Sequence, residues 1–161
     1  MDQLVRQAVR PLRVWIALGS VIIALIQGGP ASGVDLSIIE TVALDFGAII
    51  DDDGVVVLGL ADAITADPAG IHVGGAVFTG QYTISGDPFA AFSLSIVGST
   101  AAGLTIDTFT TSEGVPPLLS VALNGGGELD LRLGATLTID SGVAAPGLDQ
   151  LLSYVITIDY N

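Results

Sequence analysis

The chain has 161 residues, of which 50% are hydrophobic and 13% charged, and this composition predicts one globular domain with a buried core. Seventeen Asp and Glu against four Arg and no Lys give a formal charge of −13, so the surface repels the phosphate backbone of nucleic acids. Cysteine is absent, which excludes disulfides, thiol nucleophiles and zinc–thiolate sites.

The start of the chain predicts a secretory signal peptide over residues 1–31, followed by a single domain over residues 32–161. Three arginines among the first thirteen residues precede an apolar run from Val14 to Ile26, shorter than the roughly 20 residues of a membrane-spanning helix. Small residues follow, and we expect cleavage after Ala31, with Gly33 as the alternative. A retained anchor helix is the other interpretation. We therefore expect export to the periplasm, outer surface or medium, without a transmembrane segment in the mature chain.

From Val34 onward the sequence predicts strands, because apolar and polar residues alternate with period two. The expected strands, in chain order, are Leu36–Phe46, Val55–Leu60, Phe78–Ser85, Phe92–Ile96, Leu104–Phe109, Leu118–Leu123, Glu128–Asp140 and Leu152–Tyr160. Clusters of Gly, Pro, Asn and Asp separate these segments. About eight such strands predict an all-β fold, an antiparallel β-sandwich.

Local signals add detail to these strands. Glu40 interrupts an apolar face and indicates a bend or an exposed edge. Asn124–Gly127 predicts a hairpin and Gly86–Pro88 a turn, because Asn and Gly accept the positive φ of tight turns. Phe78 is expected on the same face as the apolar residues that follow it. The inward faces of the last two strands are expected to share one core, formed by Leu131, Leu133, Leu137, Tyr154, Ile156 and Ile158.

Candidate catalytic and metal-binding residues are few. His72 is the only histidine, lies between apolar residues, and is expected at a surface or edge position. The acidic turn Asp51–Gly54 offers hard oxygen ligands, with Asp51 and Asp53 as weak metal candidates, but it lacks the spacing of a calcium-binding loop. A solvated acidic turn is the favoured interpretation. We therefore expect no catalysis, no catalytic residues and no cofactor.

Four segments resemble a known family: Leu44–Gly47 (LDFG), Gln81–Gly86, Leu133–Ile139 and Tyr154–Asn161. They are similar to a family of bacterial exported domains that resembles spore coat protein U and the archaic chaperone–usher pilins. The resemblance covers nearly the whole mature chain, and the penultimate Tyr160 is part of it. Two departures are the absence of the disulfide common in related pilins and a short segment ahead of Leu44.

The resemblance implies that the β-sandwich of about eight strands is immunoglobulin-like, and it implies two contact segments. A periplasmic chaperone or a neighbouring subunit would bind the last strand through its alternating residues Tyr154, Ile156, Ile158 and Tyr160. A donor or edge strand would include Leu36, Ile38, Val42 and Leu44. The implied partners are further copies of the chain, other exported subunits and a periplasmic chaperone.

Two functions remain open at this point. The first is an exported structural or cell-surface subunit of pilus-like or coat-like character, since an alternating edge strand without Lys is a template for another chain. The second is a self-complete secreted β-sandwich that binds carbohydrate or calcium. Loss of Trp15 with the signal peptide would leave no Trp, the residue commonly used to stack on sugars, which favours the first function.

Overall fold

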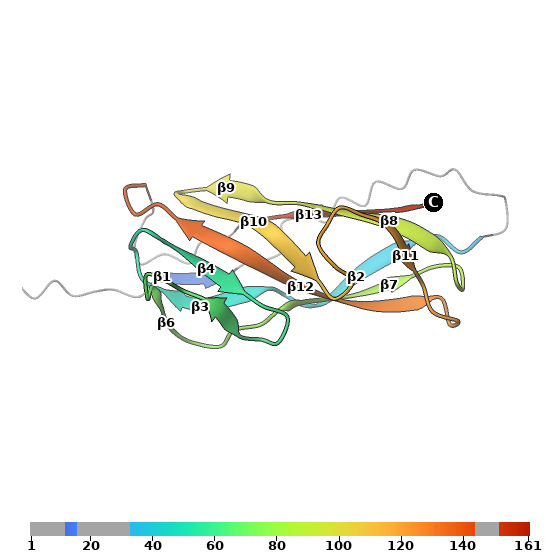
Figure 1. Cartoon of the computed structure of the whole chain (residues 1–161), viewed down its shortest axis with the longest axis horizontal. Helices are drawn as coiled ribbons and strands as arrows, with labels where there is room; N and C mark the ends of the chain where they lie inside the picture. Colours follow the sequence, from blue (N-terminus) through green and yellow to red (C-terminus); the bar gives the residue numbers. More distant parts are fainter. Residues whose placement is uncertain (1–11, 16–32, 144–151) are drawn as a thin grey trace, which may run out of the picture.

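The computed structural model describes residues 12–15, 33–143 and 152–161, and this part of the chain folds into antiparallel strands without a helix (Figure 1). The all-β prediction is therefore confirmed. The strands are β1 (Leu12–Trp15), β2 (Ser37–Val42), β3 (Asp45–Ile49), β4 (Gly54–Leu58), β5 (Ile64–Ala66), β6 (His72–Gly74), β7 (Gly80–Ser85), β8 (Ala91–Val97), β9 (Ser99–Ala101), β10 (Leu104–Thr111), β11 (Leu118–Ala122), β12 (Glu128–Ile139) and β13 (Val155–Tyr160).

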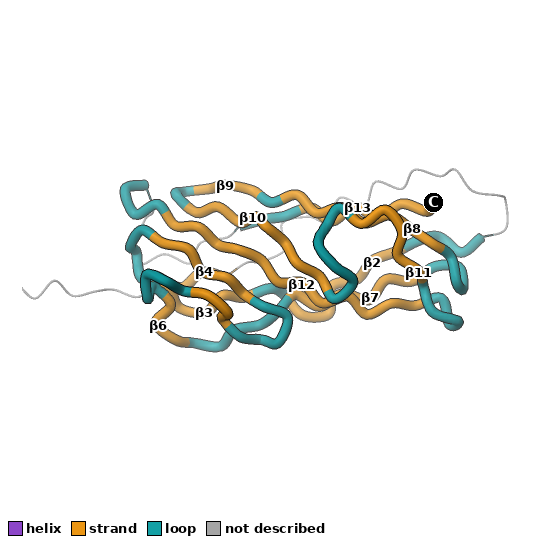
Figure 2. The backbone as a smooth tube through the Cα atoms, viewed as in Figure 1, coloured by secondary structure: helices purple, strands orange, loops and turns teal. Residues whose placement is uncertain are grey.

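The strands form three sheets. The largest has the order β2-β7-β12-β10-β9, with β4 paired to β12 and β5 paired to β4. The second has the order β11-β8-β13 and the third the order β1-β3-β6. The strands run roughly along the long axis of the molecule, and most turns lie at its two ends (Figure 2). This arrangement is a β-sandwich in which inward side chains fill the space between sheets.

The long strand β12 is the centre of the largest sheet. Its first half, Glu128–Leu133, pairs with β7, and its second half, from Ala135, pairs with β4. β10 lies along the opposite side of β12. Gly134 lies where β7 gives way to β4, and a Cβ there would approach the Leu58 carbonyl oxygen to 2.4 Å. Glycine therefore allows two strands to lie end to end against one partner.

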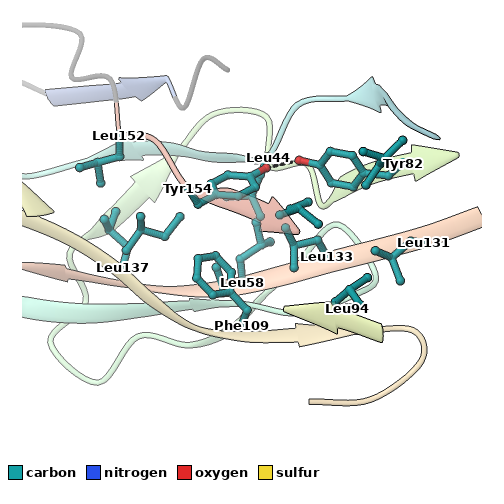
Figure 3. Close-up of a cluster of buried hydrophobic side chains, with 14 of the residues drawn as sticks. Leu44, Leu58, Tyr82, Leu94, Phe109, Leu131, Leu133, Leu137, Leu152 and Tyr154 are labelled. Atoms are coloured by element: carbon teal, nitrogen blue, oxygen red, sulfur yellow. Dashed lines mark hydrogen bonds between the residues drawn. The ribbon is translucent and has the colours of Figure 1, made fainter. Parts of the chain in front are cut away.

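The core follows the alternation predicted from the sequence (Figure 3). On β12, Leu131, Leu133, Ala135, Leu137 and Ile139 are all buried, with exposed fractions of 3% or less. All six residues predicted to share one core are buried together there. Phe46, Phe92 and Tyr82 are the bulkiest fully buried side chains from the other strands.

Some predicted strands differ from the observed ones. The segment Leu36–Phe46 is two strands, β2 and β3, in different sheets. Phe78 is 45% exposed, so its predicted inward position is wrong; it forms only an isolated bridge to Asp45, and β7 begins at Gly80. The count among the described residues is thirteen because Leu36–Phe46 divides in two and because β1, β5, β6 and β9 were not predicted. β5, β6 and β9 have three residues each, too few to show alternation.

The predicted hairpin at Asn124–Gly127 is also wrong, although a turn is present. It connects β11 to β12, which belong to different sheets and do not pair. The turn after β7 makes the same kind of crossing, and the two turns lie against each other at one end of the sandwich, on the right in Figure 1. The Gly86 N–H donates to the Gly127 carbonyl at 2.9 Å, and the Phe89 N–H donates to the Asn124 carbonyl at 3.1 Å. Local turn chemistry predicts the turn but not the pairing of the strands beside it.

One strand falls within the predicted signal peptide. β1 pairs antiparallel with β3, with Leu12 opposite Ile49 and Trp15 opposite Asp45. Residues 1–11 and 16–32, which contain the rest of this segment, lie outside the described residues. The signal peptide and its cleavage site stay predictions.

Candidate functional site

The last strand, β13, is an edge strand with a regular free side. It pairs only with β8, in one unbroken register from Val155 to Tyr160. The Asn161 N–H donates to the Ala91 carbonyl in the same register, so hydrogen-bonded pairs alternate from this point. The backbone N–H and C=O groups of Ile156, Ile158 and Tyr160 therefore point away from β8. They have no backbone partner within the part of the chain that the structure describes.

β2 is the edge strand of the other large sheet. It pairs only with β7, and its register shifts between Glu40 and Val42. The interpretation of Glu40 as a bend or exposed edge is therefore confirmed. A bulge of this kind bends an edge strand and interrupts the pattern that another chain would extend.

β2 and β13 border the same side of the sandwich, and we call this side the seam. Side chains bridge it at both ends. At one end the Tyr160 hydroxyl donates to the Val34 carbonyl, just ahead of β2, at 2.8 Å. At the other, the hydroxyls of Tyr82 and Tyr154 hydrogen-bond each other, and the Tyr82 hydroxyl lies 3.2 Å from Glu40 Oε1 on β2. The seam thus joins the free edges of the two large sheets.

The buried end of the seam is a chain of two phenols and the Glu40 carboxylate. Figure 3 shows the hydrogen bond between the two phenols. Tyr82 is 1% and Tyr154 is 8% exposed, and the Tyr154 ring packs against that of Phe109 with centroids 5.6 Å apart. Burial raises the pKa of Tyr154 to about 12 and raises the pKa of Tyr82 well above its ordinary value. Burial also raises the pKa of Glu40, against the opposing hydrogen bond from Tyr82. Both phenols therefore stay neutral and act as structural hydrogen-bonding groups.

The exposed end of the seam is built around Asp87, in the turn between β7 and β8. The Asp87 carboxylate accepts the Val34 N–H at 2.7 Å. The Asp87 N–H donates to the Tyr160 hydroxyl, also at 2.7 Å. Val34 is thus held through its nitrogen by Asp87 and through its oxygen by Tyr160, although 126 residues separate it from Tyr160.

The predicted contact residues lie mainly along this seam. In the last strand and just before it, Tyr154, Ile156 and Ile158 are buried, whereas Tyr160 is 39% exposed. In the predicted donor or edge strand, Leu36, Ile38 and Leu44 are buried in the core of their own domain and Val42 is half-buried. Leu44 lies two residues after the end of β2 and takes no part in the pairing of β2 with β7.

The roles of Tyr82, Asp87 and Val34 were not predicted. Their contacts join residues 42 or more positions apart, and no spacing rule signals such pairs. The only relevant sequence signal was Glu40, a carboxylate within an apolar pattern.

The acidic turn at Asp51–Asp53 has a structural use. The Asp53 carboxylate accepts hydrogen bonds from the Ser141 N–H and hydroxyl, both at 2.8 Å, and they lower the pKa of Asp53. This ties the β3–β4 turn to the segment that follows β12. Asp51 and His72 each have one buried polar atom without a hydrogen-bond partner. Among the residues that the structure describes, no group of three or more His, Asp or Glu side chains is placed to hold a metal ion.

His72 begins β6, an edge strand of the smallest sheet, so its predicted edge position is confirmed.

The chain's one arginine after residue 13, Arg132, lies 3.7 Å from the Asp62 carboxylate and donates to the Leu60 carbonyl. Asp62 in turn accepts both the N–H and the hydroxyl of the fully buried Thr79. These contacts fasten the β4–β5 loop, which contains Leu60 and Asp62, to β12 of the largest sheet.

Comparison with known proteins places the chain in a family. Residues 36–160 match the family described as "Domain of unknown function (DUF4402)", and the chain belongs to this family. No curated protein and no solved structure matches the chain. In the described part of the chain, no helix is long and apolar enough to cross a membrane.

Proposed function

We propose that the protein is an exported structural or cell-surface subunit, of pilus-like or coat-like character and without catalytic activity. It associates with further copies or with other exported subunits by pairing along the free edge of β13. A periplasmic chaperone is a partner of the same edge before assembly.

The observation that carries this proposal is the regular free edge of β13. The backbone N–H and C=O groups of Ile156, Ile158 and Tyr160 point away from β8. The side chains of Ile156 and Ile158 are buried in the core and hold the strand in place. Proteins that avoid edge pairing commonly place Lys or a bulge on such a strand. The register of β13 has no shift and the chain has no Lys. The edge is therefore suited to accept an extended segment.

The charge of the chain predicts how association depends on salt. With a formal charge of −13, copies repel one another at low ionic strength. At 0.1 M salt the Debye screening length is about 10 Å, so repulsion between charges farther apart than this is largely removed. We expect association through backbone pairing to strengthen as salt is added.

A matched pair of lysine substitutions tests the edge. Thr157 lies on the outward face of β13 directly opposite Ser95 on the central strand β8. Thr157→Lys places a cation on the edge strand, whereas Ser95→Lys places the same cation on its paired neighbour. Light scattering with chromatography, over a range of concentration and salt, gives the oligomeric state of the purified mature chain and of both variants.

We expect oligomers for the wild type and Ser95→Lys, and a monomer for Thr157→Lys. Oligomers in all three proteins would refute pairing at β13. Disruption by Ser95→Lys alone would indicate stacking through the face of the sheet.

One observation favours the second candidate, a self-complete binding module for carbohydrate or calcium. Leu36, Ile38 and Leu44 fill the core of their own domain, so the described fold contains its own N-terminal strand. A wild-type protein that stays monomeric at micromolar concentration across salt and calcium would support this candidate over assembly.

A further inference from the structure

The Val34 nitrogen is held at an acceptor suited to a positive charge. Asp87 Oδ1 lies 2.7 Å from this nitrogen, at the short end of the range for a neutral N–H donor. The hydroxyl of Tyr160 orients both residues, because it donates to the Val34 carbonyl and accepts the Asp87 N–H. A carboxylate fixed in this way is a receptor for an amine at the same position.

The residue before Val34 also bears on this site. A Cβ on Gly33 would lie 2.6 Å from Asp87 Oδ2, so a larger residue at position 33 would displace the second carboxylate oxygen. Gly33 and Ala31 are the small residues that a leader peptidase requires at the last and third-last positions of a leader. The Gly33–Val34 peptide bond is therefore both a predicted cleavage site and a neighbour of Asp87 Oδ2, the carboxylate oxygen that does not accept the Val34 N–H.

We propose that Asp87 binds the α-ammonium group that cleavage between Gly33 and Val34 creates. The proposal rests on the export that the proposed function includes. A leader peptidase breaks the Gly33–Val34 amide bond with one water molecule, so that Gly33 leaves as a carboxylate and the Val34 nitrogen becomes an ammonium group. Departure of Gly33 opens the space beside Asp87 Oδ2, and both carboxylate oxygens then accept hydrogen bonds from the ammonium group.

Binding of the new terminus would fix the start of the mature chain at the seam. Val34 leads directly into β2, and Tyr160 ends β13. The ion pair would hold these two edge strands together in the mature protein, whereas the uncleaved chain has only a neutral N–H at this point. Cleavage after Ala31 would instead leave the ammonium group two residues away, with Gly33 still beside Asp87.

The absence of lysine gives this proposal a specific assay. The α-amine is the only primary amine in the exported chain, so an amine-reactive acylating reagent reports on that group alone. Acylation requires the unprotonated amine, and a bound carboxylate keeps it protonated. We compare acylation rates at fixed pH for exported wild type, Asp87→Asn and the control Asp35→Asn, at concentrations low enough to keep each protein monomeric. Asp35 is exposed, near in sequence, and makes no side-chain hydrogen bond to another described residue.

N-terminal sequencing of the exported protein should give Val34 as its first residue, and Ser32 would overturn the proposal. We expect Asp87→Asn to react about tenfold faster than wild type, the change that goes with one pKa unit, and Asp35→Asn to stay within about twofold. Equal rates for wild type and Asp87→Asn would overturn it. If Asp87→Asn does not fold, the wild type is compared with itself in denaturant, where equal rates again overturn the proposal. Neither readout depends on assembly, so failure here is distinct from failure of edge pairing.

Discussion

Truncation of Leu133 to alanine should remove a large part of the stability of the domain. Leu133 is fully buried on β12, between Gly80 of β7 and Thr111 of β10. The packing around it is dense, since a Cβ on Gly80 would lie 3.3 Å from the Leu133 Cβ. Neighbours held by two ladders cannot collapse into the space that the side chain leaves. The loss should therefore be about 3 kcal/mol, out of a total of about 5–15 kcal/mol for a typical domain.

Urea unfolding followed by circular dichroism measures this loss. With a slope of about 2 kcal/mol/M, a loss of about 3 kcal/mol lowers the midpoint by about 1.5 M. Thr138→Ala is the control, because Thr138 lies on the exposed face of the same strand. It should change the unfolding free energy by only a few tenths of a kcal/mol, or about 0.2 M in the midpoint. Equal midpoint shifts in the two variants would show that the inward and outward faces of β12 are misassigned.

Two further predictions concern the turns and the buried carboxylate. Gly127→Ala should cost about 2 kcal/mol or more, because Gly127 has φ +77° and its Cβ would lie 2.3 Å from the Gly86 carbonyl oxygen. Gly126→Ala should be milder, and equal losses in urea titrations would contradict this reasoning. The raised pKa of Glu40 implies that its folded form retains a proton more readily, so its contribution to stability falls as pH rises through that pKa. Glu40→Gln should therefore gain stability relative to wild type as pH rises above 4.5, the ordinary pKa of Glu, and a constant difference would refute this.

The features predicted correctly from the sequence are those that depend on neighbours in the chain. β12 has twelve residues, and its alternation is long enough to fix which side chains point inward. The alternation in the last strand, β13, likewise fixes which of its side chains point inward. Glu40 was informative because one carboxylate in an apolar pattern indicates an irregular edge. The sandwich and most of its core follow from these local patterns.

The features that were missed depend on residues far apart. The Asn124–Gly127 turn has hairpin chemistry, but the burial needs of two sheets decide which strands pair beside it. Phe78 was expected to point inward, yet it lies before β7 in a segment that forms only a single bridge, and its side chain is exposed while that of Thr79 is buried. The seam is hidden for the same reason, because Glu40, Tyr82 and Tyr154 come together only when both sheets are in place.

The position of β12 along the chain determines when the sheet can close during synthesis. β4 and β7 both pair with β12, although β4 is complete 70 residues before β12 begins. A ribosome releases the earlier strands first; β7 can pair with β2 and β4 with β5, but these two pairs have no strand to join them into one sheet until Glu128–Ile139 appears. Long-range pairing of this kind is slow to form. The largest sheet of a chain with this topology therefore cannot close until residue 139, near the end of the sequence, has been made.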